Sequence, residues 1–155
     1  MDTYLALKSL HVFGVILFLG NIIVTGWWKS MADRTHDPKI IGFAQHQVTM
    51  TDRVFTLGGI LILAAAGAAT AATGGVSATT PWIEWSNWLF AGSGIVWIVA
   101  LLPIQTKLSR MAKRFADGGP ISDDYWRVGR LWAVFGIIAT LLPIAAVVVM
   151  VFKPA

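Results

Sequence analysis

Four long apolar runs, separated by three short polar segments, dominate the pattern of this chain. Each run exceeds the roughly 20 residues that a helix needs to cross the hydrocarbon core of a bilayer. Lipid offers no hydrogen-bond partner to an open backbone, so the runs are expected to be helical. The pattern therefore predicts an all-α integral membrane protein, a single four-helix transmembrane domain over residues 1–155. The expected helices cover about residues 4–28, 39–73, 83–106 and 123–152.

Local signals mark the ends of these helices. Trp27 and Trp28 end the first run with the aromatic rings that prefer the headgroup level, and Lys29 follows as a charge that stops the span. Asp37 and Pro38 form a helix start, because Asp caps the first turn and Pro at the first helical position gives up no hydrogen bond. The second helix is therefore expected to begin at this pair.

Charge predicts the orientation of the bundle. All Lys and Arg residues except Lys8 and Lys153 lie in, or next to, the connections after the first and third helices. The positive-inside rule places those connections in the cytoplasm and both termini outside, an N-out/C-out topology. The formal net charge of +4 is therefore interpreted as a topology signal, and no nucleic-acid partner is expected. Lipid is the expected surrounding, since 56% of the residues are hydrophobic and only 13% are charged.

One face of the first helix carries most of its polarity. His11, Asn21 and Thr25 fall within an arc of about 80° at 100° per residue, and Lys8 lies one turn from His11. An ionisable residue inside a span is a functional-site hypothesis by default. Imidazole is a common haem ligand and a nearby cation can meet a propionate, so we predict His11 as the metal ligand of a haem b. Lys8 and Asn21 are the further expected cofactor contacts.

A simpler interpretation of this face stays open. His11 can hydrogen-bond a neighbouring helix, and Lys8 can extend its ammonium to the headgroups. The chain has no cysteine, which excludes disulfides, thiolate metal sites and iron–sulfur clusters within it. A redox role therefore requires a bound cofactor.

A second polar cluster lies at the start of the second span, and its members are His46, Thr49, Asp52, Arg53 and Thr56. Most of them share one helix face, whereas Asp52 is expected to point elsewhere and to meet a basic residue of the fourth helix, Arg127 or Arg130. The cluster suits an anion or quinone headgroup, or a proton entry. An interfacial ion-pair network that anchors the helices is the favoured alternative.

Several short segments resemble a known family, and they are Leu5–Gly14 (LALKSLHVFG), Phe18–Asn21 (FLGN), Asp33–Thr35 (DRT) and Ala44–Asp52 (AQHQVTMTD). Across the whole chain they resemble a bacterial membrane family called domain of unknown function 2269. That resemblance implies a multi-pass protein of the bacterial inner membrane. More remotely, Lys8 and His11 resemble the start of HemJ-type protoporphyrinogen oxidases and CopD-like proteins. This second resemblance implies a b-type haem or copper, with His11 as ligand.

The leading expectation is a haem b protein in the membrane that transfers electrons or senses redox state. Its enzymatic activity as a membrane oxidoreductase stays open, and its partner would be a redox protein or a quinone. One alternative is a cofactor-free structural or accessory subunit whose polar stripes bind a partner helix. Another is the handling of copper or a small solute. The sequence leaves open whether the chain forms a homo-oligomer.

Overall fold

The computed structural model describes residues 2–154 and is helical throughout, apart from short connections. Four helical segments are long and apolar enough to cross a membrane, which confirms the expected all-α, four-helix membrane fold. The first segment is α1 (Thr3–Arg34) and the last is α6 (Asp123–Phe152). The second consists of α2 (Pro38–Thr51), the π turn η1 (Asp52–Thr56) and α3 (Leu57–Thr73). The third consists of α4 (Pro81–Val96), the π turn η2 (Trp97–Leu101) and α5 (Leu102–Phe115).

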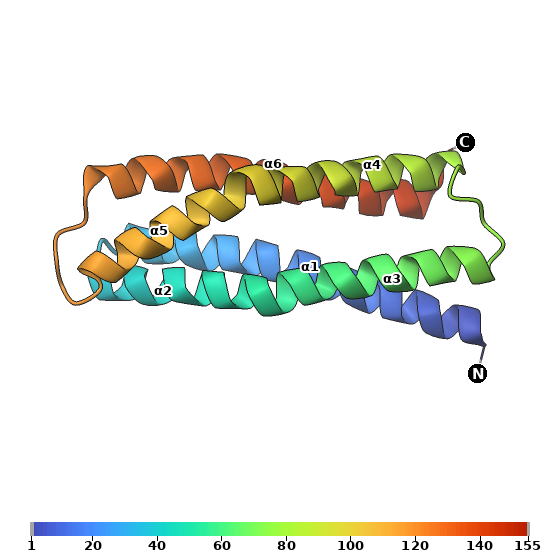
Figure 1. Ribbon diagram of the computed structural model, residues 1–155, viewed down its shortest axis with the longest axis horizontal. Helices are drawn as coiled ribbons and strands as arrows, with labels where there is room; N and C mark the ends of the chain where they lie inside the picture. The colour runs from blue at the N-terminus through green and yellow to red at the C-terminus, as the bar shows by residue number, and fades with distance from the viewer. Residues whose placement is uncertain (1, 155) are drawn as a thin grey trace.

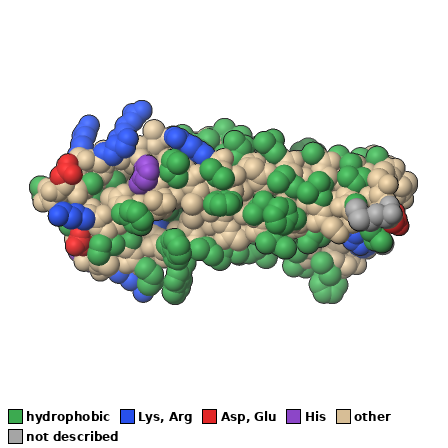
Figure 2. All heavy atoms as spheres, turned by 90° about the horizontal axis from the view of Figure 1, so that it is seen from below, with side chains coloured by type: hydrophobic (Ala, Val, Ile, Leu, Met, Phe, Trp, Pro, Cys, Tyr) green, Lys and Arg blue, Asp and Glu red, His purple; other side chains and the backbone are tan. Residues whose placement is uncertain are grey.

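The helices run as two antiparallel pairs, α1 with α3 and α4 with α6 (Figure 1). Both termini lie at one end of the molecule, here called the termini end. The connections at residues 35–37 and 116–122 lie at the other end, where Lys and Arg side chains gather, and this is called the basic end (Figures 1 and 2). The termini therefore share one side, as expected, and which side faces the cytoplasm stays a prediction.

The third segment bends at η2. Leu102 donates its backbone N–H to the carbonyl of Trp97, five residues back, and Pro103 has no N–H to donate. Proline and π turns are both known causes of a sharp bend in a helix. Beyond the bend, α5 leaves the direction of α4 and crosses to pack on α2 (Figure 1). The helix continues to Phe115, past the expected end near residue 106, because Leu108, Ala112 and Phe115 bury one of its faces.

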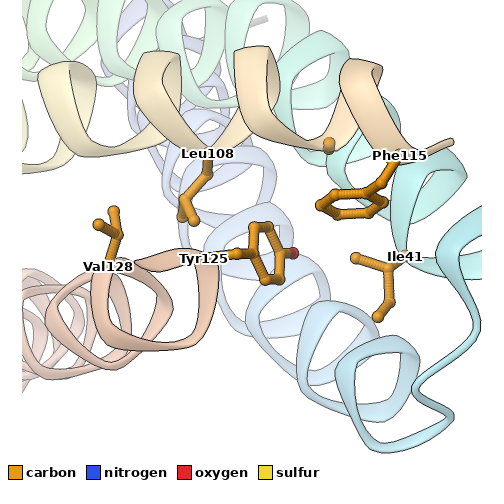
Figure 3. Packing of buried hydrophobic residues seen from close by; sticks show 6 residues of the cluster. Ile41, Leu108, Phe115, Tyr125 and Val128 are labelled. Atoms are coloured by element: carbon orange, nitrogen blue, oxygen red, sulfur yellow. The ribbon is translucent and has the colours of Figure 1, made fainter. Parts of the chain in front are cut away.

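The basic end has a compact core built from three segments. Its buried members are Ile41 of α2, Leu108, Ala112 and Phe115 of α5, and Tyr125 and Val128 of α6. Figure 3 shows the Tyr125 ring among Leu108, Phe115 and Ile41. The rings of Phe115 and Tyr125 meet edge to face, with centroids 5.1 Å apart. This geometry is the favoured one for aromatic pairs, so the core holds α2, α5 and α6 in one arrangement.

The termini end is built differently. Within the α1–α3 pair the backbones approach closely, since a Cβ on Gly14 would lie only 2.5 Å from the backbone nitrogen of Leu63. Between the two pairs, no Cα atom of α3 lies within 8 Å of one in α4 or α6 in the described part of the chain. The rings of Phe18 and Phe90 bridge α1 and α4, with centroids 5.8 Å apart. The pairs therefore diverge toward the termini.

The outer surface carries large apolar side chains along its whole length. Figure 2 shows a long middle stretch of this face on which hydrophobic side chains are spread and charged ones are scarce. Trp88, Val99 and Val151 are each about 70% exposed, a level that water would disfavour and lipid accepts. The chain is therefore an integral, multi-pass membrane protein in contact with the bilayer.

Candidate functional site

His11 lies between α1 and α3 with a defined orientation. Its Nδ1 atom is 2.6 Å from the backbone carbonyl oxygen of Leu63. A carbonyl can only accept a hydrogen bond, so Nδ1 carries a proton in this contact. The ring fits here because position 67 is glycine, where a Cβ would lie 2.7 Å from Nδ1 and 2.9 Å from Cε1 of His11.

Lys8 lies one turn from His11, toward the termini end, and is exposed. Its ammonium nitrogen is 6.0 Å from the centroid of the Tyr4 ring, at the outer limit of a cation–π contact. This position suits a group that reaches into the headgroup region. Whether Lys8 contacts a cofactor stays a prediction.

Asn21 is on the same face of α1 but joins a different group of residues. It lies ten residues from His11, about 15 Å along the helix. Its Nδ2 atom donates to Oδ1 of Asp52, at 3.1 Å, and to Oγ1 of Thr56, at 2.9 Å. The structure thus brings together Asn21 and Asp52, which the sequence pattern had assigned to two separate clusters. A role for Asn21 in a His11 site stays a prediction.

Asp52 is the centre of this polar group and is 9% exposed. Thr56 donates its hydroxyl to Oδ1 of Asp52 at 2.9 Å, and the Gln105 side chain of α5 lies beside the same carboxylate. The expected pairing with Arg127 or Arg130 is wrong. Arg127 binds Asp124 instead, and no ion pair of Asp52 exists within residues 2–154.

Thr56 belongs to this group, although Asp52 was expected to point away from it, whereas no hydrogen bond joins His46, Thr49 or Arg53 to it within residues 2–154. His46 and Arg53 are exposed on the surface of the second segment. Arg53 nevertheless borders a small cavity of about 100 Å³, which Asp52, Gln105 and Trp97 also line. The π turn η1 starts at Asp52, where Leu57 donates its N–H to the Asp52 carbonyl five residues back. A hydropathy pattern cannot show such a turn. A π turn shifts a backbone hydrogen bond by one residue and requires no particular residue type.

A buried charge at the basic end was missed by sequence reasoning. Lys29 is 1% exposed, and its ammonium contacts both carboxylate oxygens of Asp33, at 2.8 and 3.0 Å. It also lies 2.8 Å from the hydroxyl oxygen of Tyr125, which itself donates to Asp33 at 3.1 Å. The signal in the sequence is the spacing of four between Lys29 and Asp33, which allows an ion pair on one helix face.

Gln45 of α2 is a second buried polar residue that sequence reasoning missed. Its side chain is 1% exposed, and both amide atoms lack a hydrogen-bond partner within the protein. No feature of the sequence distinguishes it from the neighbouring Gln47. Within residues 2–154 there is also no group of three or more His, Asp or Glu side chains placed to hold a metal ion.

The comparisons with known proteins agree with this architecture. A family model described as "Predicted integral membrane protein (DUF2269)" matches residues 5–154, so the chain belongs to that family. This membership confirms the resemblance drawn from the sequence motifs. No curated protein and no solved structure matches the chain.

Proposed function

We propose that this family member binds one haem b through His11 and uses it to transfer electrons or to sense redox state. The observation that supports this is the 2.6 Å hydrogen bond from Nδ1 of His11 to the Leu63 carbonyl. Histidines that bind metals usually donate their other ring N–H to a carbonyl or carboxylate, which fixes the ring and directs the free nitrogen at the metal. His11 makes a hydrogen bond of this kind to the Leu63 carbonyl.

We place the proposed haem on the face of α1 that carries His11 and Phe18. His11 and Phe18 are seven residues apart, so they lie on the same face of α1, and Phe18 marks the side that faces α4. Toward the termini from that contact, the two helix pairs diverge. A haem bound there supplies one-electron exchange, whereas the chain supplies His11 as ligand and Lys8 as a cation for a propionate near the surface.

The alternatives draw less support. A cofactor-free accessory subunit was expected to offer its polar stripes to a partner helix, yet His11 and Asn21 bond within the bundle. The surface feature that favours such a subunit is an apolar groove of about 460 Å³ between α1 and α2, lined among others by Trp28 and Phe43.

Copper handling would use several His or Met ligands. His11 has no second histidine nearby, since His36 and His46 lie toward the basic end.

We also propose that the basic end faces the cytoplasm of a bacterial inner membrane. The exposed Lys107, Arg110 and Lys113 at that end support this orientation. A reporter fused after residue 155 should then behave as extracytoplasmic. A cytoplasmic signal from that fusion would reverse the topology.

The haem proposal is tested by absorption spectra of the detergent-purified protein, oxidised and then reduced with dithionite, with haem quantified against protein. We expect a b-type spectrum at close to one haem per chain. His11→Ala should lose the haem, and the matched variant His46→Ala should keep most of it, because His46 is exposed near the basic end. A colourless protein from haem-replete cells would favour the accessory subunit, and haem loss in His46→Ala alone would overturn the assignment of His11.

A second pair of variants tests the orientation of the ring without removing it. Gly67→Ala places a methyl group 2.7 Å from Nδ1 of His11, so the imidazole must move and the reduced spectrum should shift or disappear. Gly20→Ala is the control, since nothing lies within 4 Å of the added Cβ. Equal spectra for both variants would show that the contact between Gly67 and His11 is irrelevant to cofactor binding.

A further inference from the structure

We propose that Asp52 is a proton-binding site within the membrane bundle, reached by water from the basic end. The proposal concerns residues about 15 Å from His11 along α1 and does not depend on haem. It rests on the geometry of the carboxylate, on the cavity beside it and on the backbone that surrounds it.

The first support is the set of partners around the carboxylate. Asn21 of α1 and Thr56 of the second segment donate hydrogen bonds to Oδ1, and Gln105 of α5 lies beside the same group. None of these partners carries a charge. A buried carboxylate without a counter-ion is costly, and it becomes neutral when it binds a proton.

The same partners can hold both protonation states. Asn21 and Thr56 donate to the ionised carboxylate. When Asp52 is protonated, its new O–H needs an acceptor, and the amide of Gln105 offers an oxygen as well as an N–H. Gln105 is only 5% exposed, so few other groups compete for its side chain. Its contact with Asp52 can therefore be kept in both states. The site is therefore suited to exchange a proton.

The second support is a route to the surface. A cavity of about 100 Å³ lies against Asp52, room for a few water molecules at about 30 Å³ each. Arg53, Thr49 and Thr106 line it together with Asp52 and Gln105, and Arg53 is exposed. A proton can therefore arrive from water at this mouth and bind the Asp52 carboxylate.

Within residues 2–154, no equivalent polar route continues from Asp52 toward the termini end. The rings of Phe18 and Phe90 meet there, and α3 presents a run of small and aliphatic residues. The ionisable groups around the site are few. Arg53 is the charged side chain at the cavity, α1 presents Asn21, α5 presents Gln105 and η2 presents Trp97. Access is thus one-sided, from the basic end.

The third support is the backbone. The π turns η1 and η2 both border the cavity, η1 through Asp52 and η2 through Trp97. Single π turns inside α-helices occur frequently at functional sites, because the extra residue re-aims side chains and loosens the hydrogen-bond ladder. Here the two turns flank the one carboxylate in the described chain that is buried without a cation.

The test is infrared difference spectroscopy of the protein in lipid vesicles, recorded while the pH is changed. We expect a carbonyl band of a protonated carboxylic acid that disappears as the pH rises and that is absent in Asp52→Asn. Asp124→Asn is the matched control and should keep the band, since Asp124 lies at the surface and pairs with Lys107 and Arg127. The other Asp and Glu residues give their bands in both proteins, so identical carbonyl bands in the wild type and in Asp52→Asn would overturn the proposal.

Two further variants keep the result interpretable. Asn21→Leu retains the Asp52 carboxyl group and removes one of its hydrogen-bond donors, so the band should remain and change frequency. This variant tests the proposal independently of whether Asp52→Asn folds. His11→Ala should leave the band unchanged. Loss of haem with the band intact would therefore separate the two proposals, and a band unaffected by Asn21→Leu would place the acid elsewhere.

Discussion

The two halves of the bundle are held together by different interactions. At the basic end, four helical segments meet through long side chains, with Lys29, Asp33 and Tyr125 linked by hydrogen bonds beside an aromatic core. At the termini end, helices pack as two separate pairs, and glycines bring the backbones of α1 and α3 together. Side-chain chemistry connects the pairs in the first half, and close backbone packing forms each pair in the second.

Lipid explains the second arrangement. Apolar side chains gain little by leaving lipid for a helix interface, because the acyl chains are equally apolar. Close contact between small residues is then the available source of attraction. Gly59 supports this view, since a Cβ there would lie 2.7 Å from the backbone nitrogen of Phe18. This interface can therefore be formed in the middle of the membrane.

The basic end shows why long polar side chains can serve at a membrane boundary. Lys29 is buried, and removing its charge from water is compensated by Asp33, the Tyr125 hydroxyl and the ring of Trp132, whose centroid is 5.7 Å from the ammonium. The contact joins α1 to α6. It is a polar side-chain link between the two helix pairs.

The largest effect should come from breaking this link. Lys29→Met removes three hydrogen bonds of a charged group and leaves the partly exposed Asp33 without its cation, at a cost of about 3 kcal/mol of unfolding free energy. Denaturant titration in detergent, followed by circular dichroism, measures the change. Lys39→Met is the control, because Lys39 is exposed. Equal stability of the two variants would show that the Lys29 contacts do not hold the helix pairs together.

A medium effect is expected from the glycine contact. Gly14→Ala adds a methyl group 2.5 Å from the backbone nitrogen of Leu63, so α1 and α3 must separate, at a cost of about 1–3 kcal/mol. Hydrogen exchange should rise in α1 and α3 near the termini and stay low in α5. Gly20→Ala, with open space around its Cβ, should show neither change. Increased exchange that spreads over both halves would argue against their separate packing.

The smallest effect should come from Gln45. Both polar atoms of its amide are buried without a protein partner, so Gln45→Met removes a group that gains no hydrogen bond and preserves most of the volume. We expect unfolding free energy to stay within about 1 kcal/mol of the wild type or to rise. The same denaturant titration tests this. A loss as large as that of Lys29→Met would show that the Gln45 amide contributes to the basic-end core.

The fold could be predicted from the sequence because each membrane-spanning helix is indicated by residues within its own segment. Apolar runs longer than a bilayer core identify the four spans, and Asp37 does cap α2, accepting hydrogen bonds from the backbone of Lys39 and Ile40. His11 was singled out because ionisable residues inside spans are rare, and its role as a ligand stays a prediction.

Which residues meet across helices was decided by the tertiary structure. Asn21 bonds Asp52 because antiparallel α1 and the second segment align at that height, and the π turn η1 begins there. Lys29 looked like a charge at the end of a span, yet Tyr125, 96 positions away, buries it. Hydropathy and spacing describe one segment at a time. The register between segments depends on how all four segments pack. Only the tertiary structure therefore determined that Asn21 meets Asp52 and that Lys29 meets Tyr125.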